Sequence, residues 1–149
     1  MASSTPKKIG PPIRRAGRPK QKPAPVSVRR ATAGLGLFAR EAIRRGQFVI
    51  EYRGQVLPDA KAQERNTKYL FQINRNWAVD GSSRRNAARY INHSCRPNCE
   101  TDIYGKRIKV YARRNIKPGE ELTYDYGKEY FDDRIKPKGC RCAKCMGVD

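Results

Sequence analysis

The C-terminal cysteines constrain the fold of this chain more than any other feature. Three of its five cysteines, Cys140, Cys142 and Cys145, lie within six residues. A tetrahedral structural zinc site needs four ligands, and this close spacing suits a metal better than a disulfide. Cys95 or Cys99 would then supply the fourth thiolate, so the C-terminal tail has to fold back onto that region. Free reduced thiols are the alternative, but a short tail with few apolar residues gains stability most readily from a metal.

The odd number of cysteines argues against a secreted disulfide scaffold, which usually carries an even and dispersed set. No cysteine precedes Cys95. We therefore expect an intracellular, reducing compartment: a nucleus, a bacterial nucleoid and cytoplasm, or a host nucleus if the chain is a secreted bacterial effector. No apolar run approaches the ~20 residues that span a bilayer. The basic N-terminus lacks the apolar stretch of a secretory signal, and we expect no membrane partner.

The net charge of +19, from 33 basic and 14 acidic residues, predicts attraction to polyanions, with nucleic acid as the first candidate and an acidic membrane surface as the second. Residues 1–25 contain six prolines and no acidic residue. They are predicted to form a disordered basic arm, because such a segment buries too little apolar surface to offset the entropy of ordering. Residues 14–20 partly resemble an AT-hook, which inserts arginines into the minor groove of A·T-rich DNA. A solvated basic linker is the equal alternative.

From residue 26 onward, short alternating or apolar runs separated by turn signals predict a compact, mainly-β domain. The residues that we expect to form strands are 26–29, 47–52, 69–73, 77–80, 107–111 and 121–124. Residues 59–68 are rich in Ala, Lys, Gln and Glu and predict a short helix. Ser83 is expected to cap a brief helix over residues 86–89.

Gly34-Leu35-Gly36 follows the first expected strand. A plain turn is the simplest interpretation, although two glycines also let the backbone approach a ligand closely or adopt a positive φ. The third glycine and the following helix of a dinucleotide-binding fingerprint are missing, which argues against a Rossmann domain.

Two polar blocks carry further candidate site residues. Residues 89–98 read Arg-Tyr-Ile-Asn-His-Ser-Cys-Arg-Pro-Asn and hold the only histidine, and residues 121–127 read Glu-Leu-Thr-Tyr-Asp-Tyr-Gly. By residue type alone, His93 would be a satisfied structural residue, and Tyr124 and Tyr126 would be half-buried core aromatics. The two tyrosines share one face if their strand is regular. Because phenol rings attract ammonium and methylammonium groups, they are also candidates for an amine-binding site.

Taken in order, these motifs resemble the SET-domain protein-lysine N-methyltransferases. The resemblance extends over roughly residues 26–149 and rests on Gly34-x-Gly36, Glu51-Tyr52-Arg53-Gly54, Tyr69-Leu70-Phe71, residues 86–98, residues 121–127 and the cysteine-rich C-terminus. The chain departs from the family pattern at Arg85, where glycine is common, and at Tyr90, where phenylalanine is usual. Only two residues separate Cys142 from Cys145, where four are common.

The resemblance implies a mainly-β SET fold with a threaded-loop (pseudoknot) core over residues 26–128 and a small zinc-binding post-SET extension over residues 129–149. It also implies S-adenosyl-L-methionine as methyl donor and zinc as structural metal. The positions that match the family's donor-binding residues are Ala33, Gly34, Leu35, Gly36, Tyr69, Arg89, Asn92, His93, Tyr126 and Tyr130. The positions that match its zinc ligands are Cys95, Cys140, Cys142 and Cys145. By the same resemblance, Tyr126 is the catalytic tyrosine, Tyr124 tunes the number of methyl groups, and Tyr52 lines the lysine channel.

We therefore expect methyl transfer to a lysine of a histone or of another basic, DNA-associated or nucleoid-like protein. Mono- or dimethylation is favoured, because the Tyr124 hydroxyl can hold a water where a further methyl needs room. The acceptor amine has to be neutral, and burial beside a positive charge lowers its pKa, so we expect no dedicated protein base. The alternatives are an architectural DNA-binding protein on an inactive SET-like scaffold and a zinc-dependent interaction module. Tyr126, Asn92 and His93 together favour the enzyme.

Overall fold

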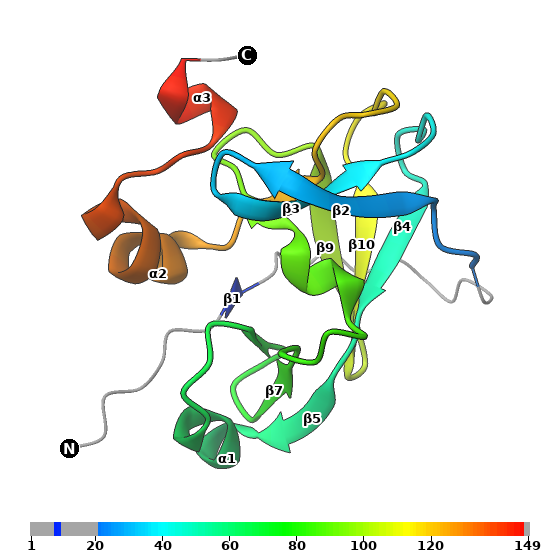
Figure 1. Ribbon diagram of the computed structural model, residues 1–149. Coiled ribbons are helices and arrows are strands. Elements are labelled where there is room, and N and C mark those ends of the chain that lie inside the picture. The colour runs from blue at the N-terminus through cyan, green and yellow to red at the C-terminus, as the bar shows by residue number, and fades with distance from the viewer. Residues whose placement is uncertain (1–7, 10–20, 148–149) are drawn as a thin grey trace.

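The computed structural model describes residues 8–9 and 21–147 (Figure 1). Within them, short strands gather into several small sheets and the helices are brief, which confirms the predicted mainly-β fold. None of the described helices is long and apolar enough to cross a membrane. Residues 1–7 and 10–20, which make up most of the predicted basic arm and include its AT-hook-like segment, lie outside the described residues, as do residues 148–149.

The first hairpin consists of β2 (Val26–Ala31) and β3 (Gly34–Ala39), which pair in antiparallel fashion. Its turn ends at Gly34, whose φ of 95° is one that residues with side chains rarely adopt. The hairpin is exposed near the turn, whereas Leu37 is completely buried in the core. The expected turn at Gly34–Gly36 is therefore displaced. The chain turns just before Gly34, and Gly34–Gly36 already belongs to β3.

An antiparallel sheet with the order β4-β10-β9 supplies much of the core. Its strands are β4 (Phe48–Tyr52), β9 (Cys99–Tyr104) and β10 (Arg107–Ala112). The central strand β10 is buried at every position after Arg107. The hairpin between β9 and β10 turns at Gly105, which has a positive φ of 60°. The strands expected over residues 47–52 and 107–111 are thus confirmed.

A second sheet has the order β1-β6-β7-β5. β5 (Gln55–Pro58), β6 (Leu70–Gln72) and β7 (Trp77–Asp80) pair in antiparallel fashion, while β1 (Lys8–Ile9) lies parallel to β6 at the sheet edge. Lys8–Ile9 belongs to the segment that the sequence predicts to be disordered, so the structure differs from that expectation here. The reason is long-range pairing with the edge of β6, which local composition does not reveal.

The helix expected over residues 59–68 is shorter than predicted. α1 spans Asp59–Glu64, and its Ala62 packs in a small apolar cluster with side chains of β5, β6 and β7. Arg65 leaves the helix with an extended backbone, at φ −81° and ψ 113°. Its guanidinium pairs with the buried Asp80 carboxylate at 2.9 Å, and this tertiary contact competes with the local helix propensity.

Two very short strands join the polar blocks at residues 89–98 and 121–127. β8 (Asn92–His93) runs parallel to β11 (Thr123–Tyr124) and is preceded by the 3-10 helix η1 (Ala87–Tyr90). The predicted cap is wrong, because η1 starts after Asn86 without a side-chain cap. The Ser83 hydroxyl instead accepts a hydrogen bond from a backbone N–H two residues later, at 3.2 Å.

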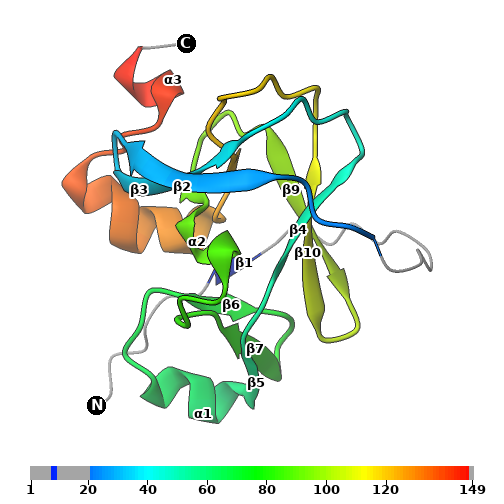
Figure 2. The same cartoon turned by 45° about the vertical axis from the view of Figure 1, so that its right-hand side comes forward.

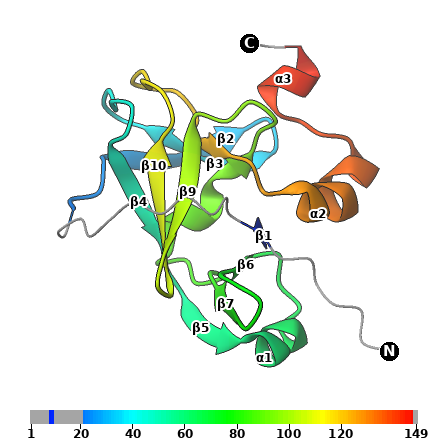
Figure 3. The ribbon, with the colours of Figure 1, turned by 180° about the vertical axis from the view of Figure 1, so that it is seen from behind.

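The chain after Gly127 forms short helical segments and runs beside the turn end of the β2–β3 hairpin (Figures 1 and 3). It comprises α2 (Lys128–Tyr130), the π-helical turn η2 (Phe131–Ile135), the 3-10 turn η3 (Lys136–Lys138) and α3 (Ala143–Met146). The tail is tied to the hairpin turn, where the Thr32 hydroxyl donates to the Arg141 carbonyl at 3.1 Å. In Figure 2, β1 lies between α2 and the β5–β7 part of the molecule.

Candidate active site

A cavity of about 840 Å³ opens where the hairpin turn, the η1–β8 segment and the C-terminal tail meet. Its size falls in the range of ~300–1,000 Å³ that is usual for small-molecule sites. The residues predicted to bind the donor that line this cavity are Ala33, Gly34, Leu35, Tyr69, Arg89, Asn92, His93, Tyr126 and Tyr130. Segments that are distant in sequence therefore converge on one hollow.

Asn92 is fixed in the cavity wall by two hydrogen bonds from its side-chain amide. Nδ2 donates to the Leu35 carbonyl at 2.9 Å and to Glu121 Oε2 at 2.8 Å. Burial raises the pKa of the Glu121 carboxyl, and the hydrogen bond from Asn92 lowers it in part. Glu121 was not among the predicted site residues, although it opens the paired-tyrosine block. The three residues tie β3, β8 and the segment before β11 together.

Gly36 differs from the other residues matched to donor-binding positions, because it does not line the cavity. A Cβ atom at this position would lie 2.5 Å from Glu121 Oε2, which is closer than real Cβ contacts. The missing side chain makes room for the Glu121 carboxylate that holds Asn92. The structure thus places Gly36 beside Glu121, and its contact with the donor stays a prediction.

His93 connects the backbone of Tyr126 with the sulfur of Cys95. Nδ1 accepts a hydrogen bond from the Tyr126 N–H at 3.0 Å, so this nitrogen carries no proton. Burial lowers the pKa of His93, against a smaller rise caused by Asp125. The ring is therefore neutral at neutral pH, with its proton on Nε2. Nε2 lies 3.5 Å from the Cys95 sulfur and is oriented to donate to it.

Tyr126 is buried at the centre of an aromatic cluster. Its hydroxyl donates to the Ile91 carbonyl. Its ring centroid lies 5.0 Å from that of Tyr124 and 5.1 Å from that of Tyr130. Burial raises the pKa of the Tyr126 phenol well above its ordinary value of 10.0. The phenol is therefore a hydrogen-bond donor and not a base at neutral pH.

Four tyrosine rings surround the amine of Lys8, which comes from β1. The Lys8 Nζ atom lies 4.4 Å from the ring centroid of Tyr126, 5.2 Å from Tyr52, 5.7 Å from Tyr69 and 5.9 Å from Tyr124. These distances lie within the ~6 Å over which ring faces attract cations. The predicted channel residues Tyr52, Tyr124 and Tyr126 are thus brought together around a lysine amine. Sequence reasoning missed Lys8, because nothing in residues 1–25 distinguishes it from the other lysines.

Two polar atoms of the site stand out among the residues that the structure describes. The Tyr124 hydroxyl and Arg89 Nε are buried there without a hydrogen-bond partner. Tyr52, by contrast, donates its hydroxyl hydrogen bond to the Tyr69 carbonyl at 2.7 Å. An unpartnered buried polar atom is costly, so both atoms are suited to meet a ligand or a water.

The cavity has a basic lining that the sequence analysis did not identify. Beyond the predicted residues, its positively charged members are Lys8, Lys68, Arg84, Arg134, Lys138 and Arg141. The Arg89 guanidinium stacks over the Tyr69 ring, with 4.2 Å from its carbon to the ring centroid. Apart from Arg89 and Arg141, these cations come from segments without a recognisable motif, so only the fold brings them together. The lining suits a small ligand that carries a carboxylate.

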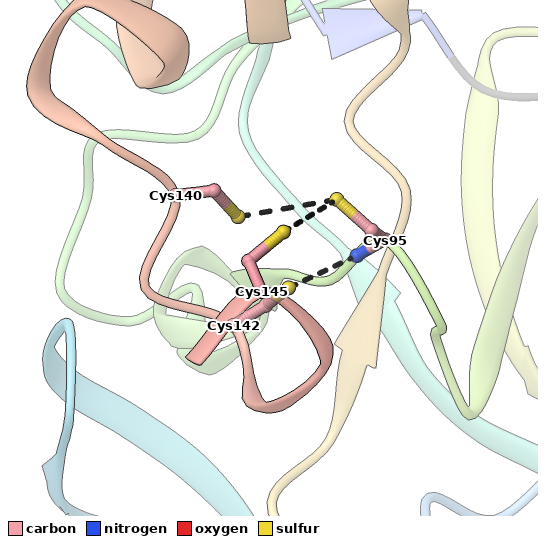
Figure 4. Close-up of side chains that lie close together, drawn as sticks. All are labelled: Cys95, Cys140, Cys142 and Cys145. Atoms are coloured by element: carbon pink, nitrogen blue, oxygen red, sulfur yellow. Dashed lines mark hydrogen bonds between the residues drawn. The ribbon is translucent and has the colours of Figure 1, made fainter. Parts of the chain in front are cut away.

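The predicted metal ligands form one compact group (Figure 4). The sulfur atoms of Cys95, Cys140, Cys142 and Cys145 all lie within 4.8 Å of one another. Cys95 Sγ is 3.9 Å from Cys140 Sγ and 3.6 Å from Cys145 Sγ. Tetrahedral zinc with Zn–S bonds of ~2.3 Å requires sulfur separations of about 3.8 Å. The short spacing between Cys142 and Cys145 is therefore compatible with a zinc site.

Cys99 does not belong to this group. It is 1% exposed and packs in the main apolar core, so Cys95 is the residue that completes the set of four thiols. Burial raises the pKa of the Cys140 thiol to about 11. Burial also raises the pKa of Cys142, but hydrogen bonds, first from the backbone of Cys95 and Cys145, bring it down to about 6. Cys142 is thus a ready thiolate, whereas Cys140 is a thiol that a metal can deprotonate.

Comparison with curated proteins finds relatives named as histone-lysine N-methyltransferases. The chain is 40% identical over 129 residues to Histone-lysine N-methyltransferase set-2 of Caenorhabditis elegans. It is 43% identical over 126 residues to Histone-lysine N-methyltransferase, H3 lysine-4 specific, of Schizosaccharomyces pombe. To Histone-lysine N-methyltransferase ASHH1 of Arabidopsis thaliana it is 36% identical over 127 residues.

Each of these matches includes 76% of this chain. The chain spans a much smaller share of the relatives, namely 8%, 14% and 26% of their lengths, respectively. The family model described as SET domain matches residues 34–127, which include both polar blocks and the strands that hold them. The chain therefore belongs to the SET-domain family, whose relatives include proteins named as histone-lysine N-methyltransferases.

Proposed function

We propose that this chain transfers a methyl group from S-adenosyl-L-methionine to the side-chain amine of a lysine in a protein substrate. The observation that carries the proposal is the tyrosine channel. A lysine amine lies among the rings of Tyr52, Tyr69, Tyr124 and Tyr126, and Tyr69 and Tyr126 also line the large cavity. A site that joins an amine channel to a small-molecule cavity is suited to group transfer between two ligands.

The cavity fits the proposed donor in its chemistry. Its basic residues, including Arg89, suit the carboxylate of an amino acid, and its aromatic residues suit a base and a positively charged sulfur. The backbone near Leu35, together with Asn92 and His93, would hold the amino-acid part, while Tyr130 would pack near the adenine. The donor supplies a methyl group bound to a cationic sulfur. After the transfer, this sulfur leaves as part of a neutral thioether.

The surroundings of the channel favour the neutral form of the acceptor amine. Burial, followed by the charges of Lys68 and Arg89, lowers the pKa of the Lys8 amine to about 7. A substrate lysine in the same place meets the same groups, so a large share of its amine is unprotonated at neutral pH. The phenols of Tyr52, Tyr124 and Tyr126 stay protonated, because burial raises each pKa well above 10.0. The acceptor amine therefore loses its proton to solvent, and no protein side chain has to act as the base.

Two tyrosines divide the remaining work. Tyr126 would orient the reacting groups through its hydroxyl, which is anchored on the Ile91 carbonyl. Alignment of this kind accounts for much of the acceleration in a transfer between two bound groups. The Tyr124 hydroxyl would hold a water beside the amine and thereby limit the product to mono- or dimethyllysine. Its lack of a hydrogen-bond partner among the described residues supports this role.

We further propose that Cys95, Cys140, Cys142 and Cys145 bind a structural zinc ion. This ion would pin residues 129–149, as a post-SET extension, against a SET domain over residues 26–128. Cys140 and Cys142 also line the cavity, so the metal would fix the wall that closes it. His93 would donate its Nε2–H to the Cys95 thiolate and link the metal to Tyr126.

The substrate proposed here is a histone or another basic, DNA-associated or nucleoid-like protein. It rests on the names of the relatives, one of which specifies lysine 4 of histone H3. A nuclear or nucleoid location would follow from such a substrate, and the basic arm over residues 1–25 would add contacts to DNA through its AT-hook-like part. The H3 tail is therefore the first substrate to test.

The test is transfer of a labelled methyl group to a panel of purified histones and nucleoid proteins. The wild-type chain is expected to label lysine in at least one of them, and Tyr126→Phe is expected to label it far more slowly. Label must be read on the separated substrate band. Absence of lysine label with the wild type, or equal rates for both proteins, would refute the proposal.

A further inference from the structure

We propose that Lys8 is itself a methyl acceptor, which β1 delivers into the channel of its own chain. This inference rests on the proposed transfer activity and names an additional substrate of that site. It makes the N-terminal arm both a modification site and a competitor of external substrates.

β1 lies on its sheet as a bound peptide would. It pairs in parallel with the edge strand β6, with Lys8 opposite Phe71 and Ile9 opposite Gln72. Addition of an extended segment to a free sheet edge is a common mode of peptide recognition, in which backbone hydrogen bonds give affinity and a side-chain pocket gives specificity. Here the pocket is the tyrosine channel and the side chain in it is Lys8.

The Lys8 side chain is buried in contacts that compensate for the loss of water. It is 1% exposed, and its amine lies nearest to the ring of Tyr126, at 4.4 Å from the centroid. Lysine is almost never fully buried without compensating contacts. The ring faces of Tyr52, Tyr69 and Tyr124 supply further contacts within 6 Å. The residues that hold Lys8 are thus the same residues that the proposed reaction uses.

The electrostatic surroundings prepare the Lys8 amine for attack on a methyl group. Burial lowers its pKa most, and the positive charges of Lys68 and Arg89 lower it further, to about 7. An exposed lysine has a reference pKa of about 10.4 and is almost wholly protonated at neutral pH. Lys8 therefore offers a free electron pair at a pH at which a lysine with the reference pKa is protonated.

The acceptor and the channel belong to one molecule. The Lys8 amine lies among tyrosine rings of its own chain, so the reaction is intramolecular.

The reaction balances with the proposed sulfonium donor alone. The ammonium group of Lys8 first loses a proton to solvent. The electron pair of Nζ then forms a bond to the methyl carbon, and the bond between that carbon and sulfur breaks with its electrons moving to sulfur. The products are an N-methylammonium group on Lys8 and a neutral thioether.

The principal test is incubation of the full chain with labelled S-adenosyl-L-methionine, followed by peptide mass spectrometry. Label is expected on Lys8, and the fraction labelled per minute should not change with protein concentration. Lys8→Arg should remove the label at this position, and Tyr126→Phe should remove most of it. Lys7→Arg makes the same change at the neighbouring lysine and should leave the label on Lys8. A fraction labelled per minute that rises in proportion to protein concentration would overturn the intramolecular reaction.

The same reactions, run with histone H3 present, separate this inference from the proposed function. Label on the histone without label on Lys8 would overturn the inference and leave the proposed function standing. Label on neither would overturn both. Lys8→Ala should also raise the initial rate on the histone, because the channel is no longer filled by the chain's own lysine.

A second test needs no donor. In protein carrying ¹³C-labelled lysine, the Cε resonance of Lys8 is expected to titrate with a midpoint near 7, well below the reference pKa of about 10.4 for lysine. The shifted resonance should be absent from Lys8→Arg and present in Lys7→Arg. Titration of every lysine above 10 would show that Lys8 does not occupy the channel and would overturn the inference.

Discussion

The tyrosine channel and the cysteine group are both assembled from distant parts of the chain, but they are held in different ways. The channel is built on paired strands, since Tyr52 ends β4 and Tyr124 ends β11, and both residues are nearly completely buried. The cysteine group depends on a tail whose helices have three to five residues, and its Cys145 is exposed. The core thus fixes the first site, whereas the second has little apolar packing of its own.

This difference indicates that the two sites respond differently to the loss of a single atom. Removal of a hydroxyl from the channel should affect the chemistry and leave the fold. Removal of a thiol, or of the proposed metal, should release the tail and leave the core. His93 contacts both sites through Tyr126 and Cys95. A change at His93 is therefore expected to affect both sites.

The largest effect is expected for Tyr126→Phe. Loss of the hydroxyl that bonds the Ile91 carbonyl should lower kcat for methyl transfer by at least about 100-fold, because small errors in alignment are this costly. The stability should fall by only about 1–3 kcal/mol, the cost of leaving the buried carbonyl unpaired. Steady-state kinetics and urea unfolding measure both quantities. Normal turnover in this variant would remove Tyr126 from the mechanism.

Next in size is the effect of disrupting the cysteine group. Cys95→Ser should abolish binding of one zinc ion per chain, measured by elemental analysis. It should lower methyl transfer by at least about 10-fold, because even loss of a group that only supports a metal ligand costs about 10–100-fold. Cys99→Ala is the matched control, because Cys99 lies in the core outside the group, and it should keep its zinc. A metal-free wild-type protein with full activity would contradict the proposed zinc site.

A smaller effect is expected from pH, through His93. The ordinary pKa of 6.5 is lowered in the folded chain by burial, so the unfolded chain binds a proton first as pH falls. The stability contributed by neutral His93 is thus complete above about 6.5 and is lost as pH falls through the lower folded pKa. Urea unfolding of the zinc-loaded protein between pH 4 and 7 measures this loss.

His93 is the only histidine of the chain, which makes the control simple. In His93→Gln, an amide oxygen can still accept from the Tyr126 N–H, but it does not titrate. This variant should therefore lack the histidine part of the pH dependence. If the pH dependence of stability in His93→Gln equals that of the wild type, it arises from other groups. That result would contradict the neutral, buried state of His93.

The smallest change in rate is expected for Tyr124→Phe, whose effect is on the product. The hydroxyl has no hydrogen-bond partner among residues 8–9 and 21–147, so its removal should change stability by less than about 1 kcal/mol. The extra room should shift products from mono- and dimethyllysine toward trimethyllysine, as read by mass spectrometry. Trimethyllysine as the main product of the wild type would sink this assignment.

Much of the site was predictable because its residues stand in recognisable motifs. The three clustered cysteines required a fourth ligand upstream, and the resemblance favoured Cys95, which the geometry of the sulfur group supports. Tyr124 of β11, Tyr126 two residues later and the Asn92–His93 pair were identified in the same way. The strands around residues 47–52 and 107–111 were predictable because they alternate or contain buried apolar runs.

Other features depend on contacts that no local pattern encodes. β8 and β11 have two residues each, which is too short for an alternation to be visible. Gly36 is required by the carboxylate of Glu121, which is distant in sequence. The place of Lys8 depends on the edge of β6, and the basic lining of the cavity depends on how the tail folds back. These are tertiary effects, and composition predicts only that the segments are polar.

The most direct measurement is a crystal structure of the chain with S-adenosyl-L-homocysteine and a lysine peptide from the histone H3 tail. We expect the thioether sulfur in the cavity beside Tyr126 and the Asn92–His93 corner. The peptide should replace β1 along β6, with its lysine nitrogen among the four tyrosine rings. A thioether bound away from Tyr126, or a peptide lysine outside the rings, would contradict the account.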